Sequence, residues 1–440
     1  MKKQSDHSLI AFVYYLNPVK AVGSRRNNVI ISSIFRHFPF KRTTVFSTSN
    51  SRYMAKEADP GFPLTARQLI TFDHNTIRCM MGPSEKKKKK ENRNAPVVEK
   101  KSGPGMIGKL LSSFLGVVTI YDGGFLYLLH GVAQIVLYRL RSPGPQVIYT
   151  SFSPMADVLL GYITKSLYGK KAYWILDFRD LFIADDRKKI FNGFHEYILK
   201  KLIRKSDLLV TVSNGLLANL EKYGPASSLT IKNGFDLNTI NYNNKVSGQK
   251  FIISYTGSIY PEHQRLDVFL EAVSSLIKKG LLDRNIVALK YVGRSKDYWD
   301  GEVNKRGLED CNESKTTVPL SEAVALQRES NVNLLMSWSY PGVKGILTAK
   351  MFDYLCALRP VITIVNGESD PELEGIFRET NCGKVFYTDQ TSKLEDYIFE
   401  LYNKHVNKLD GFNPDIDIIK SYSWTSTIQP LLKKIETEIK

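Results

Sequence analysis

The sequence predicts an α/β fold with two doubly wound domains, and three observations support this prediction. Short apolar segments with the length of buried strands recur along the chain, and helical patterns separate them. The alternation pauses at a polar stretch, residues 238–249, and then starts again. The chain has 440 residues, which is enough for two domains with separate cores. Because strands that alternate with helices build parallel sheets, we expect one parallel sheet in each half.

In the first half, five segments have the character of buried strands: residues 9–16, 43–47, 147–151, 172–176 and 208–212. Helical patterns run to about residue 38 after the first strand, and over 156–167 and 214–222. Residues 110–140 are apolar, and we expect two helical pieces there, interrupted at 122–124 by Asp-Gly-Gly. Residues 83–105 are polar and basic, with five consecutive lysines at 86–90, so we expect a mobile loop inside the first domain.

In the second half, the expected strands are residues 251–255, 287–292, 332–336 and 361–365. The expected helices are residues 266–279 and 321–329, a short helix before Arg359-Pro360, and an amphipathic helix after Trp424. We therefore predict a first domain over 1–236 and a second over 237–420. Residues 421–440 are expected to form a C-terminal helix that packs back toward the first domain.

The segment most indicative of function is residues 344–365. A small loop, residues 345–348, leads into a short amphipathic helix, and a strand of the buried type follows at 361–365. Lys350 and Asp353 lie three residues apart on one face of this helix. A helix that begins after a small loop offers free backbone N–H groups and a positive end to a phosphate. The Asp353 carboxylate can accept hydrogen bonds from a ribose or sugar hydroxyl. The alternative is an ordinary helix–strand unit of any Rossmann-like domain.

The net charge is +17, and the excess of basic residues is confined to the first half. Residues 1–236 contain 36 Lys and Arg against 17 Asp and Glu, whereas residues 237–440 contain 25 against 27. This asymmetry indicates an acidic partner, such as membrane lipid, a phosphorylated substrate or nucleic acid. A merely solvated basic surface is the alternative.

The four cysteines are scattered without metal or redox spacing, which fits a reducing cytosol. We see no signal peptide, and no apolar run reaches the roughly 18 residues that span a bilayer. The apolar segment 110–140 has Lys109, Arg139 and Arg141 at its ends, which suits a helix in the headgroup region. A buried core helix is the alternative interpretation.

Short motifs follow one another in a recognisable order. They are Gly23-Ser24-Arg25-Arg26, residues 122–125 (DGGF), 149–154 (YTSFSP), 177–180 (DFRD), 212–215 (VSNG), 233–236 (NGFD), 255–257 (YTG), 291–293 (YVG), 345–353 and Ser423-Trp424. In this order and spacing, the chain resembles bacterial glycosyltransferases of family 4. The resemblance covers nearly the whole chain. It implies the GT-B fold, in which two Rossmann-like domains face an interdomain cleft, and transfer with retention of anomeric configuration. The members most like this chain build surface polysaccharides such as O-antigen or capsule.

The sequence departs from the family pattern at several positions. The family often has two glutamates eight positions apart; here Asp353 stands at the second position and Gly345 at the first. The absent carboxylate usually contacts hydroxyls of the donor sugar, so the donor sugar stays open. Ser258 stands where many members have arginine, and His263-Gln264-Arg265 where many have lysine.

The second domain is expected to bind the donor. Lys350, Arg265 and the backbone of 345–348 are candidates to stabilise the leaving diphosphate as negative charge develops on it. Asp353 is the candidate ribose acceptor, and Arg294 the candidate for the base or a phosphate. Gly257 and Gly293 end strands at the carboxyl edge, where open α/β sheets bind ligands. The full set of expected donor-binding residues is Gly23, Gly257, Ser258, His263, Gly293, Arg294, Gly345, Ile346, Leu347, Thr348 and Asp353.

In the first domain, Asp177, Arg179 and Asp180 follow an expected strand and are candidates to orient an acceptor hydroxyl. A structural Asp–Arg pair is the alternative. In a retaining mechanism the leaving phosphate can itself take the proton, so the resemblance requires no dedicated base. Asp415-Ile416-Asp417 has the spacing of a metal motif, but it lies near the C-terminal helix. We therefore predict no metal and no cofactor.

These observations predict a glycosyltransferase that moves a sugar from a nucleotide-sugar donor to a surface glycan or lipid-linked acceptor. It is expected to be cytoplasmic and peripheral at the inner face of the cell membrane, in contact with anionic lipid. A nucleotide-sugar epimerase of similar fold is the first alternative. A non-enzymatic nucleic-acid binder is the second, although no known binding motif is present and the basic excess includes a simple lysine run.

Overall fold

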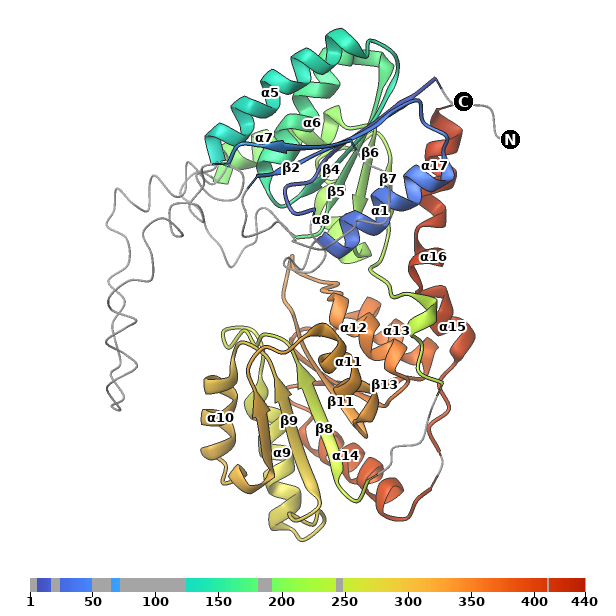
Figure 1. Ribbon diagram of the computed structural model, residues 1–440. Helices are drawn as coiled ribbons and strands as arrows, with labels where there is room; N and C mark the ends of the chain where they lie inside the picture. Colours follow the sequence, from blue (N-terminus) through green and yellow to red (C-terminus); the bar gives the residue numbers. More distant parts are fainter. Residues whose placement is uncertain are drawn as a thin grey trace. The chain divides into compact units, whose positions relative to one another are not determined.

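The computed structural model describes residues 6–16, 24–49, 65–71, 124–180, 192–242, 248–409 and 411–439. These residues form two compact units (Figure 1). Unit 1 comprises residues up to Val212, Leu220–Ile231 and the C-terminal residues from Pro430; unit 2 comprises Ser213–Asn219 and Lys232–Gln429. Gly23, the loop 83–105 and the first part of the apolar segment 110–140 lie outside the described residues.

Unit 1 is built on a seven-stranded parallel sheet with the strand order β3-β2-β1-β4-β5-β6-β7. The strands are β1 (Ser8–Phe12), β2 (Thr43–Thr48), β3 (Thr65–Leu69), β4 (Gln146–Phe152), β5 (Ala172–Phe178), β6 (Leu208–Thr211) and β7 (Ser228–Thr230). The strand order reverses between β1 and β4. The residues of these two central strands are buried, as expected of strands that carry helices on both faces.

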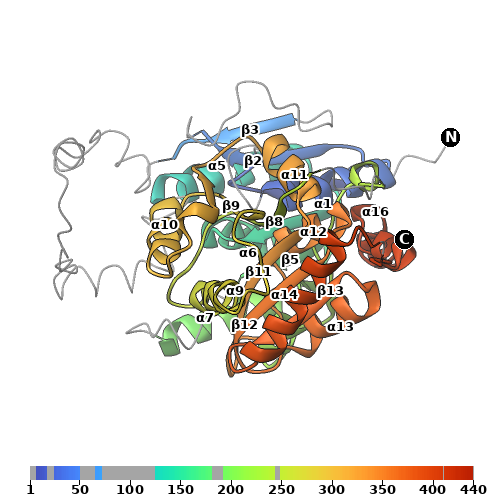
Figure 2. The same ribbon diagram turned by 90° about the horizontal axis from the view of Figure 1, so that it is seen from below.

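Helices cover both faces of this sheet (Figures 1 and 2). On one face lie α5 (Gly124–Arg141), α6 (Met155–Tyr168) and α7 (Asn192–Lys205); on the other lie α1 (Ser24–His37) and α17 (Gln429–Glu438). A short helix, α8 (Asn214–Glu221), begins in unit 2 and ends in unit 1. Helix α5 begins at Gly124; residues 122 and 123, where we also expected the helical break, lie outside the described residues.

A buried ion pair joins α1 to the sheet of unit 1. Arg26 of α1 donates Nε and Nη2 to the two carboxylate oxygens of Asp177 on β5, at 3.0 and 2.9 Å. Its Nη1 donates to the Ile231 carbonyl at 2.7 Å, and the Tyr149 hydroxyl donates to Asp177 Oδ2 at 2.8 Å. Burial, followed by the nearby Asp177 carboxylate, raises the pKa of Tyr149 well above its usual value. All three side chains are therefore fixed inside the unit.

Unit 2 is built on a six-stranded parallel sheet with the order β10-β9-β8-β11-β12-β13. The strands are β8 (Phe251–Thr256), β9 (Val287–Val292), β10 (Asn312–Lys315), β11 (Val332–Ser339), β12 (Val361–Gly367) and β13 (Gly383–Tyr387). The helices are α9 (Leu266–Lys278), α10 (Lys296–Asn304), α11 (Leu320–Glu329), α12 (Ala349–Ala357), α13 (Pro371–Thr380), α14 (Thr391–Val406), α15 (Ile416–Ser421) and α16 (Trp424–Thr427).

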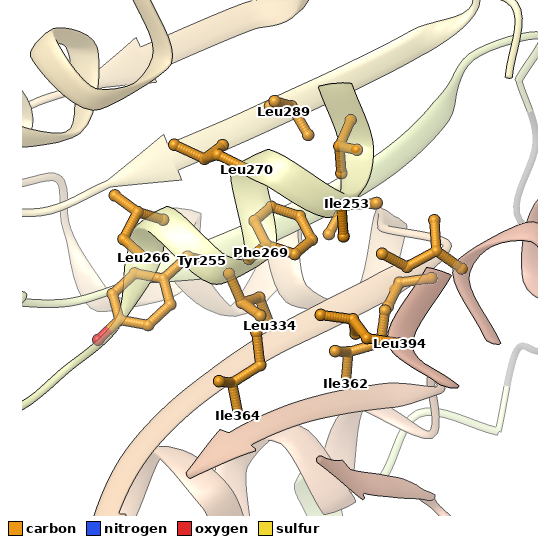
Figure 3. Packing of buried hydrophobic residues seen from close by; sticks show 14 of the residues in the cluster. Ile253, Tyr255, Leu266, Phe269, Leu270, Leu289, Leu334, Ile362, Ile364 and Leu394 are labelled. Carbon is orange, nitrogen blue, oxygen red and sulfur yellow. The ribbon is translucent and has the colours of Figure 1, made fainter. Parts of the chain in front are cut away.

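The core of unit 2 follows from the helical spacing of apolar residues in α9. Leu266, Phe269 and Leu270 lie on one face of this helix and pack on the sheet beside Leu334 and Ile364 (Figure 3). A second buried cluster lies around α12 and α13. Both sheets are doubly wound, as the alternation of strands and helices predicted. Among the described residues, no helix is long and apolar enough to cross a bilayer.

We predict that Asp177→Asn lowers the free energy of unfolding of unit 1 by about 3–5 kcal/mol, because it leaves the buried Arg26 guanidinium without its counter-charge. Asp310→Asn breaks the pair with Arg284, whose side chains are 40% and 72% exposed, and should cost about 1 kcal/mol or less. Urea denaturation of both variants checks this. Equal effects would contradict the structural role of the buried pair.

Candidate functional site

The strand order of unit 2 reverses between β8 and β11, and this reversal defines the candidate site. Helices leave the two strands on opposite faces of the sheet at such a point, which opens a crevice at the carboxyl ends of the strands. Residues 257–265 follow β8, and residues 340–348 follow β11. The residues we expected to bind the donor in this unit come mainly from these two loops and from α12.

The loop before α12 leaves the start of that helix free for a ligand. Thr348 is the N-cap residue, yet its side chain makes no capping hydrogen bond. Its hydroxyl oxygen is buried and has no hydrogen-bond partner among the residues that the structure describes. The first N–H groups of α12 are therefore without a side-chain cap, and they carry the positive end of the helix dipole. This end of α12 suits an anionic group.

The Lys350 side chain crosses from α12 to the end of β8. Its ammonium lies 3.7 Å from the centre of the Tyr255 ring, and it borders the backbone of Gly257. Among the described residues, no carboxylate forms an ion pair with Lys350. Burial lowers the pKa of Lys350 from 10.5 to about 7. Lys350 is half-buried as a residue, and its ammonium lies against the Tyr255 ring. Such a partly desolvated lysine beside a free helix start is ready to accept a phosphate, because the phosphate would supply the missing counter-charge.

A pair of carboxylates that we did not predict supports the loop before α12. Asp370 Oδ2 accepts the Gly345 N–H at 3.0 Å, and Oδ1 caps α13 through the Leu373 N–H. Glu372 accepts the N–H groups of Asn214 and Gly215, both at 3.1 Å. The sequence signal for Asp370 was present, since an Asp before Pro371 is a typical helix start. Nothing in the sequence indicated which loop it would hold.

Gly215 allows the backbone at 344–345 to approach the start of α8. A Cβ at position 215 would lie 2.2 Å from the Lys344 carbonyl oxygen and 2.9 Å from the Gly345 nitrogen. Backbone atoms cannot yield as a flexible side chain can, so only glycine fits here. The loop before α12 therefore contacts Gly215 closely and is hydrogen-bonded to Asp370.

Aromatic side chains gather at the end of β11, and we did not predict them. The rings of His263 and Trp338 are stacked, with centroids 4.9 Å apart, and Tyr260 meets Trp338 edge-on. Asn366 donates from Nδ2 to the His263 carbonyl and to the Tyr340 hydroxyl, both at 2.9 Å. Trp338 stands two residues beyond the end we expected for β11. The group offers an apolar ring surface at the same sheet edge as Lys350.

The other expected residues of unit 2 differ in how far they are exposed. Gly257 and Gly293 lie against each other at the ends of β8 and β9, and Arg294 is exposed just beyond. Ser258 follows Gly257, and Ile346 and Asp353 are half-buried. The Leu347 side chain, in contrast, packs in the core, so only its backbone is open to a donor role. The Arg265 side chain does not cap α9; its Nη2 instead lies 2.6 Å from Asp267 Oδ2 in an ion pair near the surface.

Of the expected acceptor residues in unit 1, Asp177 requires a correction. It is fully buried, and both of its oxygens are taken by Arg26 and Tyr149, so its role is structural. Arg179 donates to the carbonyls of Phe152 and Ser153 at 3.2 and 2.9 Å, which orders the end of β4. Asp180 is exposed.

A different carboxylate occupies the point where the strand order of unit 1 reverses. Asp157 of α6 accepts the Tyr14 N–H just after β1 and the Tyr127 hydroxyl of α5, both at 2.7 Å. Burial raises the pKa of Asp157 to about 7. Among the described residues, no group of three or more His, Cys, Asp or Glu side chains is arranged to hold a metal ion. The Asp415 side chain instead caps α15.

Comparisons with known proteins agree with this architecture. No family model and no curated protein sequence matches the chain. Among solved structures, sucrose-phosphate synthase from Thermosynechococcus elongatus is similar with a TM-score of 0.63 and 10% identity, over 98% of each chain. The lipopolysaccharide outer core galactosyltransferase WaaB in its apo form matches with a TM-score of 0.57 and 11% identity, over 98% of this chain and 99% of that one. A point mutant of TarM from S. aureus, solved in complex with Fondaparinux, alpha-GlcNAc-glycerol and UDP, matches with a TM-score of 0.57 and 13% identity, over 98% and 99%.

Identities this low establish the fold alone. The chain has two Rossmann-like domains of the GT-B class, as the sequence predicted. The three proteins named above are glycosyltransferases of that fold.

We predict that Gly215→Ala lowers the free energy of unfolding by about 1–3 kcal/mol, because the added methyl group meets backbone at 344–345. The matched control is Gly301→Ala in α10, where a Cβ meets nothing within 4 Å. It should be neutral or stabilise by up to about 1 kcal/mol, as alanine normally does in a helix. Chemical denaturation compares the two. A stabilising Gly215→Ala would show that the loop does not need this close approach.

Proposed function

We propose that this protein is a glycosyltransferase that transfers a sugar from a nucleotide-sugar donor, with retention, to a surface glycan or lipid-linked acceptor. The observation that carries the proposal is the desolvated Lys350 ammonium, which has no carboxylate partner among the described residues and lies beside the uncapped start of α12. The similar TarM structure was solved with UDP, and the similar pneumococcal O-GlcNAc transferase GtfA with UDP and GlcNAc. A nucleoside diphosphate fits the same chemistry here.

In this proposal the chain's own groups stabilise the leaving diphosphate. Lys350 and the first N–H groups of α12 offset the negative charge that develops on the diphosphate when the bond between the sugar's anomeric carbon and the phosphate oxygen breaks. Arg265 can join them after release from Asp267. Asp353 accepts hydrogen bonds from the ribose, and Arg294 lies at the end of β9 for the base or a phosphate. The stacked rings of His263 and Trp338 offer a surface for a sugar or base ring.

The proposed roles in unit 1 concern the acceptor. Arg179 and Asp180 follow β5 and remain candidates to orient an acceptor hydroxyl. We also propose peripheral attachment to anionic membrane on the cytoplasmic side, because residues 1–236 carry 36 basic against 17 acidic side chains. A nucleotide-sugar epimerase is the second candidate function, since it needs the same donor contacts. A nucleic-acid binder is the third, and the charge asymmetry alone supports it.

Transfer of radiolabel separates these candidates. Purified protein is incubated with labelled UDP- and GDP-sugars and a membrane lipid extract. A glycosyltransferase moves label into lipid or glycan, whereas an epimerase changes the sugar and leaves it on the nucleotide. A nucleic-acid binder does neither. Label that stays on the nucleotide with every donor and acceptor would contradict the proposed function.

We predict that Lys350→Met weakens binding of both UDP and inorganic pyrophosphate by about tenfold or more, because both carry the diphosphate. Asp353→Ala should weaken UDP but leave pyrophosphate nearly unchanged, because only UDP carries a ribose. Lys420→Met, at an exposed lysine on α15, is the control and should match wild type. Isothermal titration calorimetry measures all four proteins. Unchanged UDP affinity in both Lys350→Met and Asp353→Ala would overturn the donor assignment.

Binding should also depend on pH in a defined direction. In the free protein Lys350 loses its proton near pH 7. A bound diphosphate favours the charged ammonium, so above pH 7 binding must take up a proton and the affinity must fall by up to about tenfold per pH unit. Calorimetry at pH 8 in two buffers of different ionisation enthalpy measures this uptake. Lys350→Met should remove it; persistence of the full uptake in that variant would assign it to another group.

A further inference from the structure

Helix α5 exposes six large apolar side chains on one face. Phe125, Leu126, Leu129, Val136, Leu137 and Leu140 are each between 45% and 75% exposed. With the exposed Ala133, they fall within one sector of about 120° on the helix, at 100° per residue. We call these seven residues the outer stripe of α5. A surface helix normally shows the opposite arrangement, with its aliphatic side facing the core.

The inner face of α5 explains why the outer stripe cannot simply rotate inward. This face consists of Gly124, Tyr127, Gly131, Ile135 and Tyr138. A Cβ at position 131 would lie 2.6 Å from a Leu160 methyl carbon, so α5 and α6 pack closely at that glycine. The Tyr127 hydroxyl donates to the buried Asp157 carboxylate at 2.7 Å. A half turn of α5 would break this hydrogen bond and place leucines against α6, where there is no room.

The surroundings of the outer stripe are basic. At the C-terminal end of α5 lie Arg139, over the Tyr168 ring at 4.6 Å, and Arg141; Lys170 and Lys171 directly follow α6. Helix α5 contains no acidic residue, and the one in α6, Asp157, is buried. The exposed surface of these two helices therefore combines apolar side chains with positive charges and carries no negative charge. This combination is typical of a helix that lies in the headgroup region of an anionic membrane.

We propose that the outer stripe of α5 inserts into an anionic lipid surface, with the helix lying flat and Arg139, Arg141, Lys170 and Lys171 at the headgroups. The proposal rests on the proposed function, in which the acceptor is lipid-linked, and it names the part of the chain that meets the lipid. A second copy of the chain is a poorer occupant. Two outer stripes facing each other would bring together basic surfaces with no acidic residue of α5 or α6 to pair with them.

The first experiment measures flotation of the full-length protein with vesicles. Wild type should bind vesicles of phosphatidylcholine and phosphatidylglycerol more strongly than vesicles of phosphatidylcholine alone, and the difference should shrink as salt rises. The triple variant Phe125→Ser, Leu129→Ser, Leu140→Ser should bind the anionic vesicles about tenfold more weakly or worse. These side chains are exposed, so the fold should not suffer. The matched control, Leu320→Ser, Val406→Ser, Leu409→Ser, removes similarly exposed apolar residues from unit 2 and should bind as wild type does.

The second experiment locates the contact through the fluorescence that an added tryptophan contributes over wild type. In Leu129→Trp, this added signal should be quenched by brominated lipid and, without vesicles, by aqueous iodide. In Leu320→Trp, it should respond to iodide only. Quenching of both variants by brominated lipid would show unspecific adsorption and overturn the proposal. Protection of the Leu129→Trp signal from iodide in the absence of lipid would show that the chain itself or a second copy covers the outer stripe. This result would also overturn the proposal. Light scattering of the free protein distinguishes cover by the same chain from cover by a second copy.

The outcomes also separate this inference from the proposed function. If the triple variant binds anionic vesicles as wild type does, the α5 inference fails whatever the enzymatic result. If the triple variant loses binding while the labelled sugar never leaves the nucleotide, the docking surface stands and the transferase proposal fails. Nucleotide affinity of the triple variant should equal that of wild type, because the donor residues belong to unit 2.

Discussion

The ammonium of Lys350, held against the Tyr255 ring without a counter-ion among the described residues, is the contact on which the proposed chemistry depends. It exists because the strand order of unit 2 reverses between β8 and β11, which brings α12 and the loop after β8 to one sheet edge. The electrostatic attraction between the ammonium and the ring offsets part of the hydration free energy that the ammonium loses on burial. The remaining cost appears as a pKa lowered to about 7. An anionic ligand would remove that cost, so the site favours a diphosphate before any specific contact with a sugar.

The rest of the site keeps this lysine and the start of α12 in place. Gly215 lets the loop before α12 approach the start of α8, and the Asp370 carboxylate holds the Gly345 N–H. In unit 1 a similar logic applies to the ion pair of Arg26 and Asp177, which joins α1 to the sheet. Asp177 is fully buried in this pair, which favours a structural role over the acceptor-binding role that the sequence suggested.

The sequence predicts the parts of the fold that depend on apolar patterning. Strand β9 has the expected bounds, and α9 ends one residue earlier than expected, because both carry regular apolar residues. Strands β3, β7, β10 and β13 were not predicted. Each lies at the edge of a sheet, and β10 has the sequence Asn-Glu-Ser-Lys, which contains no apolar residue. Lys350 and Asp353 could be proposed as donor-binding residues because they are close in sequence. Glu372 was missed because only the tertiary fold brings it near Gly345 in the loop before α12. Trp338 was missed because β11 continues beyond residue 336, where we expected it to end. The inner face of α5 was missed because the sequence of this helix is apolar on nearly every side.

The most direct test of the central claim is a crystal structure of the protein with UDP. We expect density for the diphosphate at the first N–H groups of α12, with a phosphate oxygen within hydrogen-bond distance of Lys350 Nζ and the ribose beside Asp353. A well-ordered UDP bound elsewhere on the chain, with Lys350 still lying against Tyr255 and no phosphate near it, would contradict the account.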